Sequence, residues 1–335
     1  MTTKKLLPLS ALILLVLSFS SCKKDDGDDF SGPTAQALNE TFGTGFEDET
    51  LRDVSIDKNG TIYVSSRTKI YKLDANGNAT VFAGSNTASV TDGQGTAATF
   101  KNIDLLSFDN AGNIYTIDYQ VIRKISPGGT VTSLVNDGSF PLLFKDFEEL
   151  PPYQQPLFTG LAVVEDAIYA SSQGFIVKIK GTAYSIFAGF EAGFVDGQGN
   201  NAKFQYIRTV IADASGNNVL VTDRGSIRKV SLADIVVTTI TGSDQYGKKD
   251  GKLNEASYPW INDMVIDKDG NYYLATFDTV RKISTDGLVS TIAGPIKSDG
   301  SSFQGGGIAV DANARYLYVT DLNKKATLIR IDLSK

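Results

Sequence analysis

Six side chains that could bind a metal ion or an anion stand at related places along the chain. They are Arg52, Asp53, Asp104, Arg208, Asn262 and Asp263. Carboxylate and amide oxygens are the ligands that calcium prefers, whereas a guanidinium binds a carboxylate group or a sugar acid. The same residues could also line a water-filled funnel without binding anything. The sequence leaves these three interpretations open.

Aromatic side chains indicate a second kind of contact. Trp260 is the only tryptophan, and Tyr119, Phe175 and Phe277 lie at comparable places in other parts of the chain. Together they could form a stacking platform for sugar rings, because an aromatic ring offers a large, rigid contact area. Packing between structural repeats is the alternative explanation.

Two residue types are scarce enough to exclude whole classes of chemistry. The chain has no histidine and one cysteine, Cys22. Histidine-dependent nucleophilic triads, histidine-ligated zinc and imidazole general bases are therefore excluded. Intramolecular disulfides are excluded as well. Cysteine catalysis is excluded if Cys22 is acylated.

The elements that must position these residues come from an internal repeat. Each copy has an apolar strand ending near Asp, a Gly- or Asn-rich turn, a strand containing Tyr or Leu, a strand with a basic residue, and a strand closing on Gly. The basic residue of the third strand recurs six times, 48 to 54 residues apart, at Lys72, Lys124, Lys178, Lys229, Lys282 and Arg330.

Six such copies predict an all-β, six-bladed β-propeller, because radial stacking buries both faces of each small sheet. Pairs of adjacent residues should precede the first strands and ring one mouth of the channel. Those with polar side chains are Arg52-Asp53, Asp104-Leu105, Arg208-Thr209 and Asn262-Asp263. The sixth copy ends after its third strand. Residues 39–44 resemble a fourth strand, so we expect this N-terminal strand to close the last blade.

Two kinds of segment then carry a specific resemblance. Val54-Ser55-Ile56-Asp57…Gly60-Thr61-Ile62-Tyr63-Val64 and the connectors beginning Asp92-Gly93-Gln94-Gly95 and Asp196-Gly197-Gln198-Gly199 are similar to NHL repeats. The resemblance covers roughly residues 40 to 334 and implies an NHL-type propeller. The connectors lack the Lys of a phosphate-binding loop, so a repeat-specific turn is the favoured interpretation.

That resemblance also bears on activity, since the fold hosts enzymes, scaffolds and binders. Lyases on similar propellers depend on histidines, which this chain lacks. Related lactonases hold a calcium or zinc ion on the axis with carboxylates and amides, usually including a glutamate. No glutamate stands in the predicted ring. A metal-dependent lactonase therefore stays an alternative, with one divalent cation such as calcium as its cofactor; otherwise no cofactor is expected.

The first residues predict export and a lipid anchor. Lys4 and Lys5 precede an apolar run from Leu6 to Leu17, and Cys22 follows in a segment that resembles a lipoprotein cleavage site. We expect a signal peptide over 1–21, a lipidated Cys22 with an acidic tether over 22–36, and the propeller over 37–335. An ordinary signal peptide with an incidental cysteine is the alternative.

The tether contains Lys24-Asp25-Asp26, which resembles the surface-export signal of some Gram-negative lipoproteins. The tether is therefore interpreted as an export signal that places the protein in the outer membrane with the propeller facing the cell exterior. The alternative is that the tether is only a spacer. Removal of the signal peptide changes the net charge from −6 to −8, which disfavours nucleic acid as a partner.

We therefore expect a monomeric, non-catalytic binding module for a glycan or an envelope protein. The aromatic, Pro-rich segment 138–158 could contribute a contact surface or fold back over its neighbouring blades.

Overall fold

A computed structural model describes residues 41–119, 121–135, 158–294 and 302–334 of the chain. All of them belong to the compact unit Gly32–Lys335. The expected signal peptide, Cys22, the tether and most of the 138–158 segment lie outside the described residues. Within the described ranges, no helix has the length and apolar character needed to cross a membrane.

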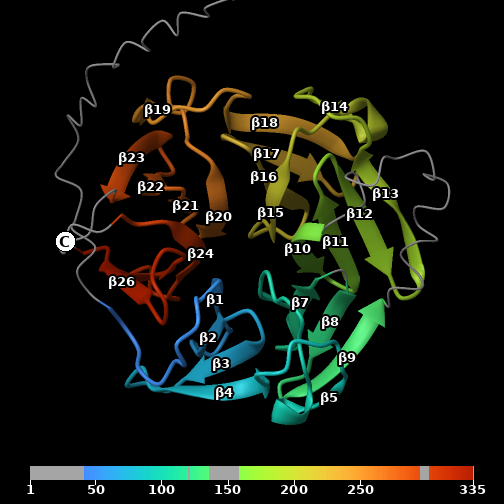
Figure 1. Cartoon of the computed structure of the whole chain (residues 1–335). Helices are drawn as coiled ribbons and strands as arrows, with labels where there is room; N and C mark the ends of the chain where they lie inside the picture. Colours follow the sequence, from blue (N-terminus) through green and yellow to red (C-terminus); the bar gives the residue numbers. More distant parts are fainter. Residues whose placement is uncertain (1–40, 120, 136–157, 295–301, 335) are drawn as a thin grey trace, which may run out of the picture. The chain divides into compact units, whose positions relative to one another are not determined.

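Six antiparallel sheets surround one axis, and their innermost strands converge near the centre (Figure 1). The first three blades consist of β1 (Asp53–Ile56), β2 (Ile62–Ser65), β3 (Lys69–Leu73) and β4 (Ala79–Gly84); β5 (Gly93–Gln94), β6 (Ser107–Phe108), β7 (Ile114–Asp118), β8 (Val121–Ile125) and β9 (Thr130–Val135); and β10 (Phe158–Val164), β11 (Ala167–Ser172), β12 (Phe175–Lys180) and β13 (Ala183–Gly189).

The remaining three blades show the same meander. They consist of β14 (Gly197–Gln198), β15 (Ile207–Ala212), β16 (Asn218–Asp223), β17 (Ser226–Ser231) and β18 (Val236–Gly242); β19 (Gly251–Lys252), β20 (Ile261–Ile266), β21 (Tyr272–Thr276), β22 (Val280–Ile283) and β23 (Leu288–Ala293); and β24 (Gly305–Val310), β25 (Tyr316–Asp321) and β26 (Leu328–Asp332). Helical structure in the described ranges is limited to the 3-10 turns η1 (Gly95–Ala97) and η4 (Gly199–Asn201).

The prediction of an all-β, six-bladed propeller is confirmed, and each third strand lies where the repeat places it. The hairpins between first and second strands follow from their turn residues. In the first blade, Asp57 accepts hydrogen bonds from the amides of Asn59 and Thr61, and Gly60 takes the left-handed conformation with φ +82°. Asp and Gly favour such turns for these two reasons.

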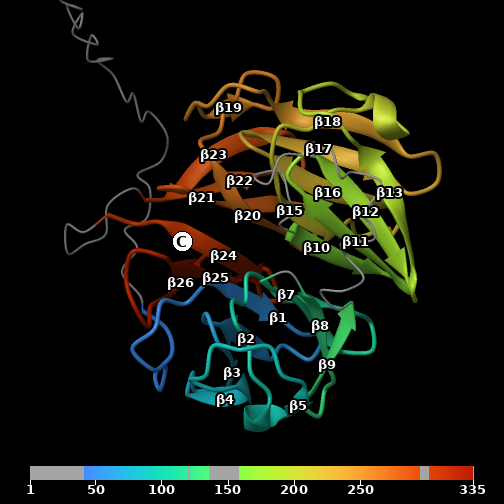
Figure 2. The same cartoon turned by 45° about the vertical axis from the view of Figure 1, so that its right-hand side comes forward.

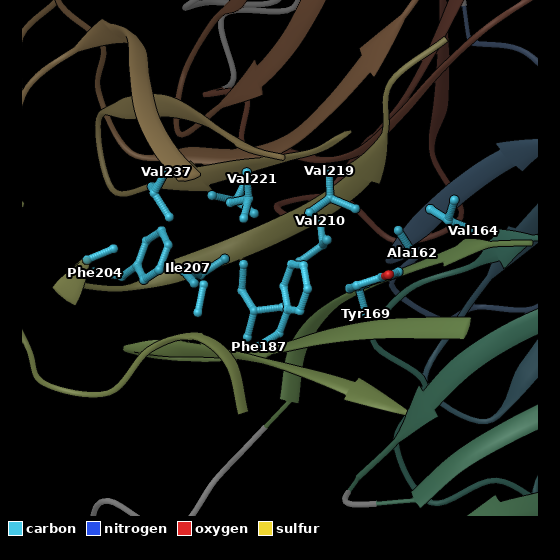
Figure 3. Packing of buried hydrophobic residues seen from close by; sticks show 14 of the residues in the cluster. Ala162, Val164, Tyr169, Phe187, Phe204, Ile207, Val210, Val219, Val221 and Val237 are labelled. Atoms are coloured by element: carbon cyan, nitrogen blue, oxygen red, sulfur yellow. The ribbon is translucent and has the colours of Figure 1, made fainter. Parts of the chain in front are cut away.

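The core is divided among the six interfaces between neighbouring blades. Each of six clusters of buried apolar side chains joins residues from two adjacent sheets. Figure 3 shows one of them, where Tyr169 and Phe187 of the third blade face Val210, Val219 and Val221 of the fourth. Each blade therefore depends on its neighbours to cover its apolar faces.

The Asp-Gly connectors form short outer strands rather than simple turns. β5, β14 and β19 each pair with the outermost strand of the following blade (Figure 2). The connector Asp196 accepts hydrogen bonds from the amide and hydroxyl of Thr239. It also pairs with Arg228, whose other guanidinium nitrogen contacts the fully buried Asp223. These connectors are structural.

The same arrangement recurs in two other blades. Arg123 pairs with Asp92 and Asp118, and Arg281 pairs with Asp250. The residue that anchors the connector is thus the buried arginine, and the lysine that follows it in the sequence defines only the period of the repeat.

The N-terminal segment closes the ring, although more briefly than expected. Thr41 forms an antiparallel bridge with Ile329, and the Phe42 amide donates to the Leu328 carbonyl at 2.7 Å. The chain then turns away, since Thr44 bridges Asn78 in the first blade. Residues 39 and 40 of the expected closing strand lie outside the described residues. The described contacts place the first and last copies of the repeat side by side.

Candidate functional site

Two layers of residues surround the axial channel, and each is made of one residue per blade near the start of the innermost strand. The upper layer consists of Arg52, Asp104, Thr159, Arg208, Asn262 and Gly306, and the lower layer of Asp53, Leu105, Gly160, Thr209, Asp263 and Gly307. All of them line one cavity of about 1130 Å³. The sequence therefore located the lining of the channel correctly.

The lower carboxylates tie neighbouring blades together. Asp53 accepts hydrogen bonds from the amides of Val54 and Leu106, the second of which lies in the next blade. Asp263 accepts from the Ile308 amide of the sixth blade and from the Thr209 hydroxyl of the fourth. Their oxygens are thus engaged in holding the ring together.

Burial raises the pKa of both carboxyl groups. It raises the pKa of Asp263 to about 6, against the opposing effect of its amide hydrogen bonds and of Arg208. Burial and the nearby Asp263 carboxylate raise the pKa of Asp53 well above its ordinary value.

Glycines in the sixth blade allow the first blade to approach it closely. A Cβ added at Gly307 would lie 2.6 Å from the Asp53 Cα, and one at Gly306 would lie 2.7 Å from the Arg52 carbonyl oxygen. The Gly307 amide donates to that carbonyl at 2.9 Å. The run Gly305-Gly306-Gly307 is therefore required by the packing around the axis.

The two arginines of the upper layer differ in their partners. Arg52 pairs with Asp104 at 3.2 Å, and Asp104 also accepts from the Asn102 amide group. Burial raises the pKa of Asp104, and the arginine charges partly offset that effect. Arg208, half-buried in the cavity wall, forms no hydrogen bond or ion pair with any described residue. Its donors are available to a ligand, and its charge acts on the Asp53, Asp104 and Asp263 carboxyls of the cavity.

Loops between second and third strands form a rim around the cavity. Tyr119 and Arg224 occupy two-residue hairpin loops with φ of +62° and +55°, a conformation that favours Asn or Gly. The Tyr119 amide donates to the Asn102 carbonyl, and the Arg224 amide donates to the Tyr206 carbonyl. Non-glycine residues in this conformation cost stability, and the same conformation occurs at Glu165, Ile235 and Ala314 in other turns of the chain.

An aromatic shelf leads outward from the cavity, and we define it as Tyr206, Trp260 and Tyr246. The Tyr206 ring lies 5.2 Å from the Trp260 ring, which lies 6.1 Å from the Tyr246 ring. Tyr206 also lines the cavity. Phe277 is more than half exposed beside the shelf, where its amide donates to the Trp260 carbonyl. Tyr119 lies in the second blade and is not part of the shelf.

The sequence analysis named Trp260 but missed its shelf partners Tyr206 and Tyr246. Tyr206 and Trp260 both stand two residues after a buried aromatic that follows a connector, Phe204 and Tyr258. Alignment of the copies on that buried aromatic would have paired them. Lys101 was missed too, and its ammonium lies 3.9 Å from the centre of the Tyr119 ring.

A metal site does not emerge from the geometry. Among the described residues, no group of three or more Asp, Glu, Cys or His side chains is arranged to hold a metal ion. Asn262 donates from its side chain to the Gly305 carbonyl at 2.7 Å, so it too is engaged between blades.

Comparison with known proteins supports the fold. No family model and no curated protein matches the sequence. A protein of unknown function from Bacteroides thetaiotaomicron is 14% identical over 89% of this chain and 75% of its own, with a TM-score of 0.62. An auxiliary nutrient binding protein from Bacteroides ovatus is 14% identical over 87% of this chain and 75% of its own, with a TM-score of 0.61.

An enzyme is similar as well, to a slightly lesser degree. A gluconolactonase from Xanthomonas campestris is 11% identical over 88% of this chain and 88% of its own, with a TM-score of 0.57. At such identities the likeness establishes a shared six-bladed propeller and leaves the chemistry to the residues of this chain.

Proposed function

We propose that this protein is a non-catalytic binding module whose ligand, a glycan, occupies the mouth of the axial channel. The observation that carries the proposal is the cavity of about 1130 Å³ with the uncommitted Arg208 in its wall. A concave site with a few convergent polar groups is the usual form of a ligand site. The similarity to a nutrient binding propeller supports a binding role.

Display of this module at the cell surface is the second part of the proposal. The expected lipid on Cys22 and the acidic tether would hold the propeller at the outer membrane, facing the exterior. Labelling of the expressed protein with radioactive palmitate, compared with Cys22→Ala, tests the anchor. Protease treatment of intact cells tests the display.

A metal-dependent lactonase is the second candidate, and its support is the gluconolactonase of the same fold. The carboxylate oxygens of Asp53 and Asp263 accept hydrogen bonds from neighbouring blades, which disfavours it, and the Asn262 side-chain nitrogen donates to the Gly305 carbonyl. Elemental analysis after purification without chelators separates the candidates. One tightly bound divalent ion per chain, lost in Asp263→Ala, would favour the lactonase.

The binding proposal is tested by screening the purified protein against immobilised glycans and envelope proteins. We expect binding to at least one glycan, with a loss in Arg208→Gln and none in Lys229→Gln. Lys229 is an exposed cation of β17, so it controls for the change of charge. Binding that survives Arg208→Gln at full strength would place the site elsewhere.

A further inference from the structure

We propose that the ligand is an acidic oligosaccharide, with one carboxylate held by Arg208 opposite Arg52 and a neighbouring sugar ring stacked on the aromatic shelf. The inference rests on the proposed function and names its substrate class. It follows from the charge of the mouth, the free guanidinium and the path of the shelf.

The cavity is lined by four cations, Arg52, Arg67, Lys101 and Arg208, and by three carboxylates, Asp53, Asp104 and Asp263. Asp104 is paired with Arg52, and Asp53 and Asp263 accept hydrogen bonds from amides of neighbouring blades. Arg67, Lys101 and Arg208 form no ion pair within the part of the chain that the structure describes. Such cations attract anionic ligands to the cavity.

The two upper-layer arginines provide a place for a carboxylate. Arg52 directly precedes β1, and Arg208 is the second residue of β15. These are the inner strands of the first and fourth blades, which face each other across the axis (Figure 1). Arg52 is held in place by Asp104. Arg208 keeps its full set of donors, and a planar guanidinium binds a carboxylate through two parallel hydrogen bonds.

The shelf explains why the ligand should extend beyond one sugar. Tyr206 joins the cavity wall to Trp260, and Trp260 leads to Tyr246, which is about half exposed. Arg224 lies over the Tyr246 ring at 5.6 Å and donates to the Gln205 side chain. A chain of sugars could thus leave the cavity along aromatic faces with a cation beside them.

Single-stranded nucleic acid also combines stacking with positive charge, but it needs a basic groove along its backbone. Here the cavity mixes cations with the carboxylates Asp53, Asp104 and Asp263, so its lining is no continuous basic groove. A short acidic sugar needs only a few cations and fits this lining better than a long polyanion.

Calorimetric titration of the purified full chain tests the proposal. The probes are an oligouronate of four units, the same oligosaccharide with its carboxylates reduced to alcohols, the monouronate, and a single-stranded oligonucleotide. The variants are Arg208→Gln, Trp260→Ala and Tyr246→Ala, with Lys229→Gln as the control. Tyr246 is exposed, so its variant tests the shelf even if Trp260→Ala fails to fold.

We expect the oligouronate to bind at least about tenfold more tightly than its reduced form, and Arg208→Gln to weaken it by about 10- to 100-fold. The shelf variants should weaken the oligouronate by about tenfold and the monouronate less. Lys229→Gln should change neither.

Three results would overturn the inference in distinguishable ways. Equal affinity for the acidic and reduced forms, with a loss in the shelf variants, would keep a glycan site and reject the acidic ligand. Tighter binding of the oligonucleotide would reject the sugar. Absence of binding to every probe, together with a negative glycan screen, would reject the proposed function itself.

Discussion

Removal of the Arg228 guanidinium should destabilise the propeller far more than removal of its exposed neighbour. Arg228 is fully buried and donates to the carbonyls of Val195 and Lys203 and to the carboxylates of Asp196 and Asp223. In Arg228→Met, the exposed side of Asp196 regains water. Asp223 has no exposed surface and loses the one cation with which it is paired among the described residues.

The magnitude follows from that buried carboxylate. Breaking a buried ion pair by removing one partner costs about 3–5 kcal/mol. Protonation limits the cost, because neutralising a group of ordinary pKa 3.8 at pH 7 takes about 4 kcal/mol at 1.36 kcal/mol per unit. At pH 5 the same limit falls to about 2 kcal/mol. We therefore expect a loss of about 3–4 kcal/mol at pH 7 that shrinks by roughly half at pH 5.

Urea unfolding followed by the fluorescence of Trp260, the only tryptophan, measures these differences. Lys229→Met removes the same charge from an exposed position on the same strand and should cost less than about 0.5 kcal/mol. A loss in Arg228→Met of under about 1 kcal/mol, or one equal to the control, would refute the role given to the buried pair. A loss that is the same at both pH values would assign it to packing instead.

Three further outcomes are expected. Phe42→Ala should lower the free energy of unfolding by about 1–3 kcal/mol in urea titration, because Phe42 packs on β25 at the ring closure; an unchanged curve would argue against closure by this segment. Gly307→Ala should cost more than about 3 kcal/mol in the same assay, since its Cβ would meet Asp53, whereas Gly60→Ala, with open space around it and only its turn conformation strained, should cost about 1 kcal/mol. In Asp263→Asn, the free energy of unfolding should depend less on pH. Burial raises the pKa of Asp263 to about 6 from 3.8, so its ionisation makes the wild type less stable as pH rises between these values. An identical pH profile for the two proteins would contradict that assignment.

The fold could be predicted from the sequence because local patterns that repeat along the chain specify it. Strand alternation, turns such as Asp57–Gly60 and a period of 48 to 54 residues define a blade without reference to distant contacts. The channel-lining positions followed, because each lies at a fixed place near the start of a first strand. Ring closure at Thr41 was predictable for the same reason, since the last copy lacks a strand.

The state of each side chain was decided by tertiary structure. Asp53, Asp263 and Asn262 have the composition of a metal site, but each is engaged by groups of another blade. Arg228 and Lys229 are adjacent cations in the sequence, and only the stacking of a connector on the outer strand buries the first.

By itself, then, the sequence determined the number of blades, the strands and the positions that face the axis, because backbone pairing and apolar alternation repeat within about fifty residues. Only the closed ring decided which polar groups bind one another and which stay free. Arg208 and the shelf of Tyr206, Trp260 and Tyr246 can be recognised as a candidate site only in the closed ring. Their neighbours come from other blades, through contacts that no local pattern specifies.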